Sequence, residues 1–380
     1  MEYKRLGDVI SIKKGKKIEQ VEESENTIRY IQIDDLRNDD NIKFCEKIDK
    51  YVMAEKEDII IAWDGANAGT VGFGLNGAIG STLARLDIND NEIDTIYCAM
   101  FLRSKFKYLR EKCTGATIPH LSRASLEDLK LPKPSLETQK KIVEVLDKAQ
   151  SLIDKKKEQI ELLDELVKSR FVEMFGDISK NPKGWENKKL GKLGTVKSSK
   201  RVFVNELVES GIPFYRGTEV GALSTGGKIE PTLFITKEHY EILKKSTGVP
   251  IIGDLLLPSI CPDGRIWIVN TEEEFYFKDG RVLWIHLENC SINSVFLKYM
   301  LCEKFNRDYN KIASGTTFAE LKIFSLKDID VILPPIELQN EFAEFVTQTD
   351  SIRSKMETSL SELEDNFNSL MKKAFKGELF

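Results

Sequence analysis

Two short loops carry the residues of this chain best suited to hold a phosphate group. The loops, CTGATIPHL at 113–121 and ASGTTFAEL at 313–321, share a Gly-x-Thr core formed by Gly115 with Thr117 and by Gly315 with Thr317. A glycine lets the backbone approach a phosphate closely, and a threonine supplies a small hydroxyl donor. A plain turn is the alternative. Because both loops follow a basic helical stretch, the pattern favours contact with a nucleic-acid backbone.

Local runs of Lys and Arg supply the charge that such contact needs. The chain has a net charge of -5, which argues against a globally basic binder but leaves room for a basic face. A solvated face balanced by nearby acids is the other interpretation of each run. The runs recur near the start of each half, and this recurrence favours phosphate contacts by Lys13, Lys14, Lys16, Lys197, Lys200 and Arg201.

Motifs for catalysis are missing from the sequence. Residues 72–77 spell GxGxxG, but the following AIGSTLARLDI indicates a turn and a strand instead of the helix that dinucleotide binding needs. No phosphate loop, GxSxG elbow or Asn/Asp-Pro-Pro-aromatic tetrapeptide occurs. His120, His239 and His286 lack ligand spacing, and the six cysteines form no CxxC pair. We therefore expect a chain without catalytic residues, a metal or a cofactor of its own.

A long internal repeat organises these candidates. The segment 115–175 recurs at 315–375 without a gap, and Gly115, Pro134, Gln139 and Phe175 are among the residues that match at an offset of 200. The starts of the halves match at an offset of 184, so the second half holds roughly 16 more residues. Most of these should lie between its runs IPFYRG and DLLLPSI. The sequence predicts two copies of one module.

Each copy is predicted to be a mixed α/β (α+β) domain followed by one long helix. Short β-rich runs, such as 58–63 and 81–88, alternate with Gly-rich turns, and helical stretches follow at 95–112 and 294–312. The predicted limits are a first module at 1–134, a central helix at 135–177, a second module at 178–334 and a C-terminal helix at 335–380.

Apolar residues of both long helices recur with an average spacing of 3.5, which is typical of a coiled-coil seam. Lys156, Thr349 and Arg353 interrupt the seam. A helix lying on its own domain is the alternative, but two such helices in one chain favour an antiparallel pair. The predicted interface residues are Ile142, Leu146, Ile153, Ile160, Leu163, Val167, Phe342, Val346, Met356, Leu360, Leu363 and Phe367.

The composition indicates a folded protein of the cytoplasm. The apolar fraction of 41% is ordinary, and no apolar run is long enough to cross a membrane. The start, MEYKRLGDVI, lacks a hydrophobic signal core. We therefore expect neither export nor a membrane partner.

The whole organisation resembles the specificity subunit of type I restriction-modification systems. The sequence segments that carry the resemblance are RLGDV at 5–9, KLGKLG at 189–194, the two Gly-x-Thr loops, PKPSLETQKKIV at 132–143, PPIELQNEF at 334–342 and AFKGEL at 374–379. Family members commonly have a Glu-Gln pair where this chain has Thr138-Gln139 and Leu338-Gln339.

The resemblance implies that each module is a target-recognition domain for one half of a bipartite, asymmetric sequence in double-stranded DNA. It also implies that the helix pair sets the spacing and docks modification subunits. Those separate chains would use S-adenosylmethionine, and an ATP-driven restriction subunit, with Mg, would translocate and cleave DNA. The polar residues that we predict to read bases are Gln32, Arg37, Asn67, Arg216, Thr218 and Arg265.

Two other classes of protein stay open at this point. One is a DNA methyltransferase or nuclease that acts alone. The other is a coiled-coil scaffold that does not bind DNA.

Overall fold

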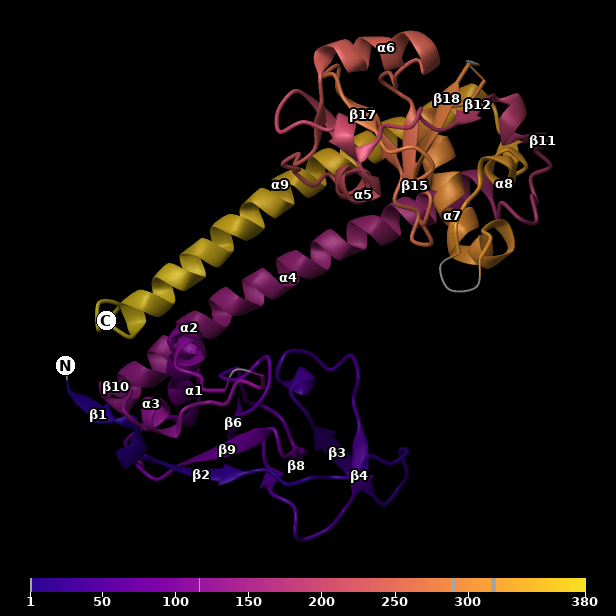
Figure 1. Ribbon diagram of the computed structural model, residues 1–380. Helices are drawn as coiled ribbons and strands as arrows, with labels where there is room; N and C mark the ends of the chain where they lie inside the picture. The colour runs from indigo at the N-terminus through magenta and orange to yellow at the C-terminus, as the bar shows by residue number, and fades with distance from the viewer. Residues whose placement is uncertain (1, 116, 289–290, 316–318) are drawn as a thin grey trace. The chain divides into compact units, whose positions relative to one another are not determined.

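Two units make up the computed structural model, and the first of them is assembled from two separate stretches of chain (Figure 1). The first unit comprises residues 1–158 and 356–380, and the second comprises residues 159–355. The structure describes residues 2–115, 117–288, 291–315 and 319–380. Within this described part, no helix is both long and apolar enough to span a membrane.

The first unit contains two four-stranded sheets. One has the order β2 (Ile10–Lys14), β9 (Leu83–Ile88), β6 (Ile59–Ala62) and β7 (Val71–Gly72), all antiparallel. The other has the order β4 (Phe44–Glu46), β3 (Thr27–Ile31), β8 (Gly77–Ile79) and β5 (Met53–Ala54), in which β3 and β8 run parallel. A strand pair and three helices complete the module: β1 (Tyr3–Arg5), β10 (Lys130–Pro132), α1 (Thr95–Ser104), α2 (Phe106–Glu111) and α3 (Arg123–Glu127).

The second unit repeats this topology. Its main sheet has the order β12 (Gly194–Lys197), β18 (Val282–Leu287), β15 (Leu255–Pro258) and β16 (Trp267–Ile268). The other sheet has the order β14 (Phe234–Ile235), β13 (Ile212–Tyr215) and β17 (Tyr276–Phe277), again with one parallel pair. The remaining elements are the strand pair β11 (Glu186–Lys189) and β19 (Asp330–Leu333), and the helices α7 (Ser294–Ile312) and α8 (Ile323–Lys327). The shared fold predicted from the repeat is confirmed.

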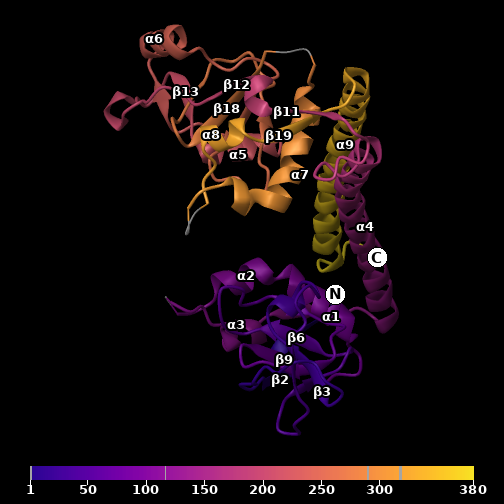
Figure 2. The same cartoon turned by 90° about the vertical axis from the view of Figure 1, so that its right-hand side faces the viewer.

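The extra residues of the second module form two helices. The segment between β13 and β15 is longer than the segment between β3 and β6, as predicted, and it contains α5 (Gly217–Ser224) and α6 (Lys237–Thr247). Both views place α6 at the side of this module remote from α7 (Figures 1 and 2). The residues 78–88, which follow the GxGxxG run, lie in β8, a turn and β9, so the expected turn and strand are confirmed.

The long helices are α4 (Leu136–Phe175, 40 residues) and α9 (Ile336–Ala374, 39 residues). A buried glutamine ties the start of each helix to its module. Gln139 Nε2 donates to the carbonyl oxygens of Glu92 and Pro134 at 2.8 and 2.9 Å, and its Oε1 accepts from Asp94 N at 2.8 Å. Gln339 makes the same three bonds in the second unit, to Ser291, Pro334 and Asn293.

Each unit also receives the end of the other long helix. In the first unit the Phe375 ring of α9 lies 5.4 Å from Tyr97 and 5.5 Å from Phe101, both on α1. In the second unit the Phe175 ring of α4 lies 4.7 Å from Phe296 on α7. Since each unit combines the start of one long helix with the end of the other, the predicted antiparallel direction is confirmed within each unit.

The seam residues near the helix ends belong to the two cores. Ile142, Leu146 and Phe367 pack in the core of the first unit, and Val167, Phe342 and Val346 pack in the core of the second. Ile153 is buried, and the five other seam residues are half-buried: Ile160, Leu163, Met356, Leu360 and Leu363. Pairing along the full seam stays a prediction.

Two of the three polar interruptions of the seam have partners. Arg353 Nη2 donates to Asp164 Oδ1 at 2.5 Å within the second unit. The buried Thr349 hydroxyl donates to the Phe345 carbonyl at 2.9 Å, so it needs no partner on another helix. These interruptions are therefore compatible with a helix pair.

Candidate nucleic-acid interface

The candidate site of the first module lies at one end of its main sheet. The loop 113–121 returns to the end of β6, where Leu121 N donates to the Trp63 carbonyl at 2.8 Å. Thr114 and His120 close the loop by exchanging backbone hydrogen bonds of 2.9 and 2.7 Å. This pinning brings the Gly-x-Thr loop beside Lys14, the last residue of β2.

Asp64 connects the predicted elements at this edge. Its Oδ2 lies 3.0 Å from Lys14 Nζ, and its Oδ1 lies 2.7 Å from His120 Nδ1. The carboxylate is largely covered, whereas the side chains of Lys14 and His120 are 51% and 52% exposed. The arrangement holds an exposed ammonium group and an exposed imidazole at a fixed separation, which suits contacts with phosphate oxygens or base edges.

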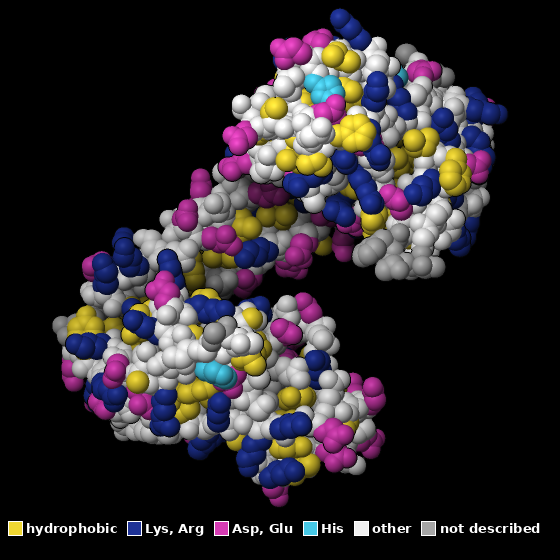
Figure 3. Space-filling view, in the orientation of Figure 1, with side chains coloured by type: hydrophobic (Ala, Val, Ile, Leu, Met, Phe, Trp, Pro, Cys, Tyr) yellow, Lys and Arg dark blue, Asp and Glu magenta, His cyan; other side chains and the backbone are white. Residues whose placement is uncertain are grey.

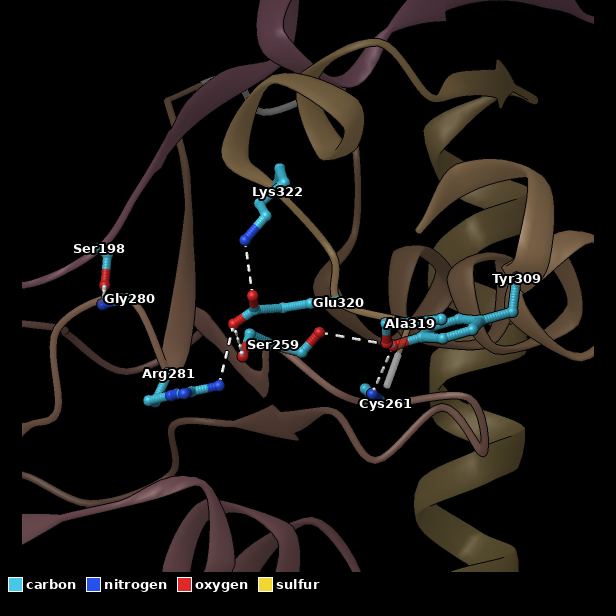
Figure 4. Close-up of polar contacts among 9 residues, drawn as sticks. All are labelled: Ser198, Ser259, Cys261, Gly280, Arg281, Tyr309, Ala319, Glu320 and Lys322. Carbon is cyan, nitrogen blue, oxygen red and sulfur yellow. Dashed lines mark hydrogen bonds and ion pairs between the residues drawn. The ribbon is translucent and has the colours of Figure 1, made fainter. Parts of the chain in front are cut away.

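The second module builds the same edge from different side chains (Figure 4). Leu321 N donates to the Ser259 carbonyl at 2.7 Å, and Ser314 and Glu320 exchange two backbone bonds of 2.9 Å. Glu320 accepts from Ser259 Oγ at 2.9 Å, from Lys322 Nζ at 2.5 Å and from Arg281 Nη1 at 3.3 Å. The hydrogen bond from Lys322 is the largest influence on the pKa of the Glu320 carboxyl, which lies below its ordinary value.

Tyr309 anchors the second loop from behind (Figure 4). Its hydroxyl accepts from Cys261 N at 2.8 Å and donates to the Ala319 carbonyl at 3.1 Å. Tyr309 is buried at the end of α7, so the loop is held against a rigid element. Polar groups at this edge are consequently oriented before any ligand arrives.

The loop glycines have the backbone geometry that the sequence suggested. Gly115 has φ +96°, and a Cβ atom there would lie 2.4 Å from the Ile118 carbonyl oxygen. Gly315 has φ +123°. Both values lie in the region that favours glycine. Thr117 is exposed, and Thr317 lies outside the described residues.

Two of the three predicted base readers of the first module contact each other. Arg37 Nη2 donates to Asn67 Oδ1 at 2.5 Å, although thirty positions separate them in the chain. Gln32 follows β3 directly, and its Oε1 accepts from Lys43 Nζ at 2.8 Å. The structure therefore brings Arg37 together with Asn67 and gives Gln32 another partner.

The predicted readers of the second module gather around α5. Arg216 and Thr218 both bond Glu219, Arg216 Nη2 at 2.6 Å and Thr218 Oγ1 at 2.9 Å. A Cβ atom at Gly221 of this helix would lie 3.0 Å from Arg265 Nη1, so Arg265 also borders α5. Burial alone would raise the pKa of the Glu219 carboxyl, but the hydrogen bonds from Arg216 and Thr218 lower it to about 2.

The remaining predicted cations differ in how firmly the module holds them. Lys13 pairs with Asp87 at 2.7 Å and Arg201 with Asp279 at 3.1 Å. Lys197 donates to the Thr247 carbonyl at 2.8 Å and lies 4.0 Å above the Trp284 ring. Lys16 and Lys200 are exposed and form no ion pair with the described carboxylates.

Sequence reasoning missed the acidic and polar side chains that organise this edge, namely Asp64, Ser259, Arg281, Glu320 and Lys322. The repeat contains a signal for Glu320, because residues 120 and 320 each follow the loop glycine by five positions. His120 is exposed and lies within hydrogen-bond distance of Asp64. Among the described residues, no group of three His, Cys, Asp or Glu side chains is placed to hold a metal ion.

The fold and the site together define a two-copy α/β protein with long helices and a polar edge on each copy. Residues 1–163 and 182–365 match the family described as the Type I restriction modification DNA specificity domain. These matches cover most of the chain, so the chain belongs to this family, whose domain provides DNA specificity in type I restriction-modification systems.

Named relatives extend along nearly the whole chain. The type I restriction enzyme MjaVIII specificity subunit of Methanocaldococcus jannaschii is 28% identical over 378 residues, which cover 92% of this chain and 86% of the relative. The EcoBI specificity subunit of Escherichia coli is 23% identical over 385 residues, covering 91% and 78%.

Solved structures share the fold. The type I restriction-modification S subunit from M. genitalium aligns with a TM-score of 0.56 at 18% identity, covering 98% of this chain and 96% of that one. A chain from a structure described as showing complex assembly and conformational transition of the type I R-M system aligns with a TM-score of 0.63 at 16% identity, covering 100% and 98%.

Proposed function

We propose that the two modules read the two halves of one bipartite, asymmetric DNA sequence. The observation that carries this proposal is a common backbone edge with different side chains. Lys14, Asp64 and His120 form the edge in the first module, and Ser259 and Glu320 form it in the second. The same backbone arrangement with different donors and acceptors suits the recognition of two different half-sites.

The division of labour along the chain is part of the proposal. Residues 1–134 and 178–334 act as the recognition domains, and the polar groups around Asn67 and α5 contact bases. The Gly-x-Thr loops and the exposed lysines contact phosphates. Residues 135–177 and 335–380 set the distance between the half-sites and dock two modification subunits.

The chain itself has no catalytic role in this proposal. Modification subunits bring S-adenosylmethionine and methylate the DNA, and a restriction subunit brings ATP and Mg for translocation and cleavage. The support is the sequence, which lacks the motifs for phosphate-loop, methylation and hydrolase chemistry. The assembly would work in the cytoplasm, where its DNA lies.

Salt dependence of DNA binding tests the proposal. We expect the affinity of the purified chain for genomic fragments, measured by fluorescence anisotropy, to fall linearly on a logarithmic salt axis, because lysines displace counterions from phosphates. Absence of any salt-dependent affinity would favour the coiled-coil scaffold. Methyl transfer by the chain alone, with labelled S-adenosylmethionine, would favour the stand-alone enzyme.

A further inference from the structure

The first unit has a hollow of about 700 Å³ where three helical segments meet. The junction of α1 and α2, the start of α4 and the end of α9 line it. Buried apolar side chains form its floor, namely Met100, Leu146, Met371 and Phe375. The partly exposed rings of Phe106 and Phe367 form its walls. The space-filling view shows Lys and Arg side chains beside hydrophobic ones over the region of α2 (Figure 3).

Four lysines surround this hollow: Lys105, Lys107, Lys372 and Lys376. None of them pairs with a carboxylate among the described residues, and Asp147 is the acid that shares the lining. Three of the six predicted phosphate-binding cations of the modules, Lys13, Lys14 and Arg201, have such partners. The mutual repulsion of the four lysines is therefore not balanced within the unit.

Helix dipoles do not explain this charge. Lys372 lies in the last turn of α9, where a cation is favourable. Lys107 lies in the first turn of α2, where the dipole disfavours a cation. An external anionic partner would account for all four lysines at once.

Different side chains occupy the equivalent place among the described residues of the second unit. Aligning the helix caps Asp94 and Asn293 puts Tyr299 where Met100 lies, and the Tyr299 ring stands 5.3 Å from Phe342. In the repeat, Lys372 and Lys376 correspond to Val172 and Gly176, and Lys107 corresponds to Asn306. Three of the four lysines are therefore specific to the first unit, whereas Lys105 corresponds to Lys304, which pairs with Asp308 at 3.9 Å.

We propose that the hollow receives an acidic amphipathic segment of a modification subunit. One apolar side chain of the segment enters against Met371 and Phe375, and flanking carboxylates meet the lysines. DNA phosphates would use the lysines but not the apolar floor. This inference rests on the proposed function and adds that the two modification subunits bind unequally, because the described residues of the two units differ at this place.

The test measures binding of the purified modification subunit to the full chain, without DNA, by calorimetry and native mass spectrometry at low and moderate salt. The charge variant is K107E with K372E, and its control is K47E with K50E, which makes the same charge change on exposed lysines elsewhere in the first unit. The filling variant is Asn368→Trp, at the hollow, and its control is Asn366→Trp, equally exposed on α9 but outside the lining.

We expect the charge and filling variants each to weaken one binding step by roughly tenfold and to leave the other step unchanged. Both controls should bind as the natural chain does. Unchanged binding of both variants would overturn the inference. It would also fall if the charge variant lost DNA affinity but kept both modification subunits. A natural chain that binds no modification subunit would instead overturn the proposed function.

Discussion

At the scale of single residues, two glutamines fix the long helices to the modules. Gln139 satisfies one backbone N–H and two carbonyl groups at the start of α4, and its side chain is fully buried. The family pattern of Glu-Gln is replaced here by Thr138-Gln139, but the residue that makes the contacts is kept. The sequence repeat marked both glutamines without indicating what they bond.

We predict that Gln139→Ala lowers the free energy of unfolding of the first unit by about 1–3 kcal/mol, because three buried polar groups lose their partner. Urea denaturation followed by circular dichroism measures the change. Gln159→Ala, at an exposed position of α4, is the matched control and should leave the midpoint in place. An unshifted midpoint for Gln139→Ala would show that the glutamine does not hold the helix.

Gly115 is the residue whose replacement should alter DNA binding with least effect elsewhere. Gly115→Ala adds a Cβ atom 2.4 Å from the Ile118 carbonyl oxygen, so the loop must change shape. We expect a several-fold loss of DNA affinity with an unchanged circular dichroism spectrum. The control is Gly74→Ala, which has φ +79° but open space around the new atom. Equal affinities of both variants would argue against a role of the loop shape.

The Arg216–Glu219 pair should make the second module sensitive to acid. The pKa of the Glu219 carboxyl is about 2, below its ordinary value of 4.5. A lowered pKa gives stability that is fully present above pH 4.5 and is lost as the pH falls toward 2. Glu219→Gln should flatten this part of the stability profile in thermal unfolding between pH 5 and pH 2. A profile that stayed as steep would assign the acid sensitivity to other carboxylates.

At the scale of elements, hydrophobic periodicity predicted the long helices well and the sheets only in part. The spacing of Ile142 and Leu146 predicted a helix that exists, because a 3.5-residue repeat has few other solutions. The stretch 95–112 is instead two helices, since Lys105 leaves helical geometry. Strand order and the meeting of Arg37 with Asn67 depend on long-range packing, which local pattern does not encode.

The long helices lead to a prediction about spacing. Inserting four residues after Ala149 lengthens α4 by about 6 Å. We expect the preferred distance between the half-sites to grow by a base pair or two, with the half-site sequences unchanged. Mapping methylated sites in cells that carry the insertion measures it. An active complex that kept the old spacer length would show that the helices connect the modules without measuring the DNA.

At the scale of the whole molecule, duplication accounts for the proposed reading of an asymmetric sequence by one chain. Each unit takes the start of one long helix and the end of the other, as Phe375 on Tyr97 and Phe175 on Phe296 show. The same frame is thus assembled twice. The recognition edges that it carries have diverged in charge, from Lys14 and His120 to Ser259 and Glu320.

The most direct test of recognition by two independent modules is to graft residues 1–134 from a relative with a different target and to map the methylated sites in the complete complex. The account predicts that one half of the methylated sequence changes to that of the relative, while the other half and the spacer length stay the same. A graft that folds and supports methylation but alters both halves, or neither, would contradict recognition by two independent modules.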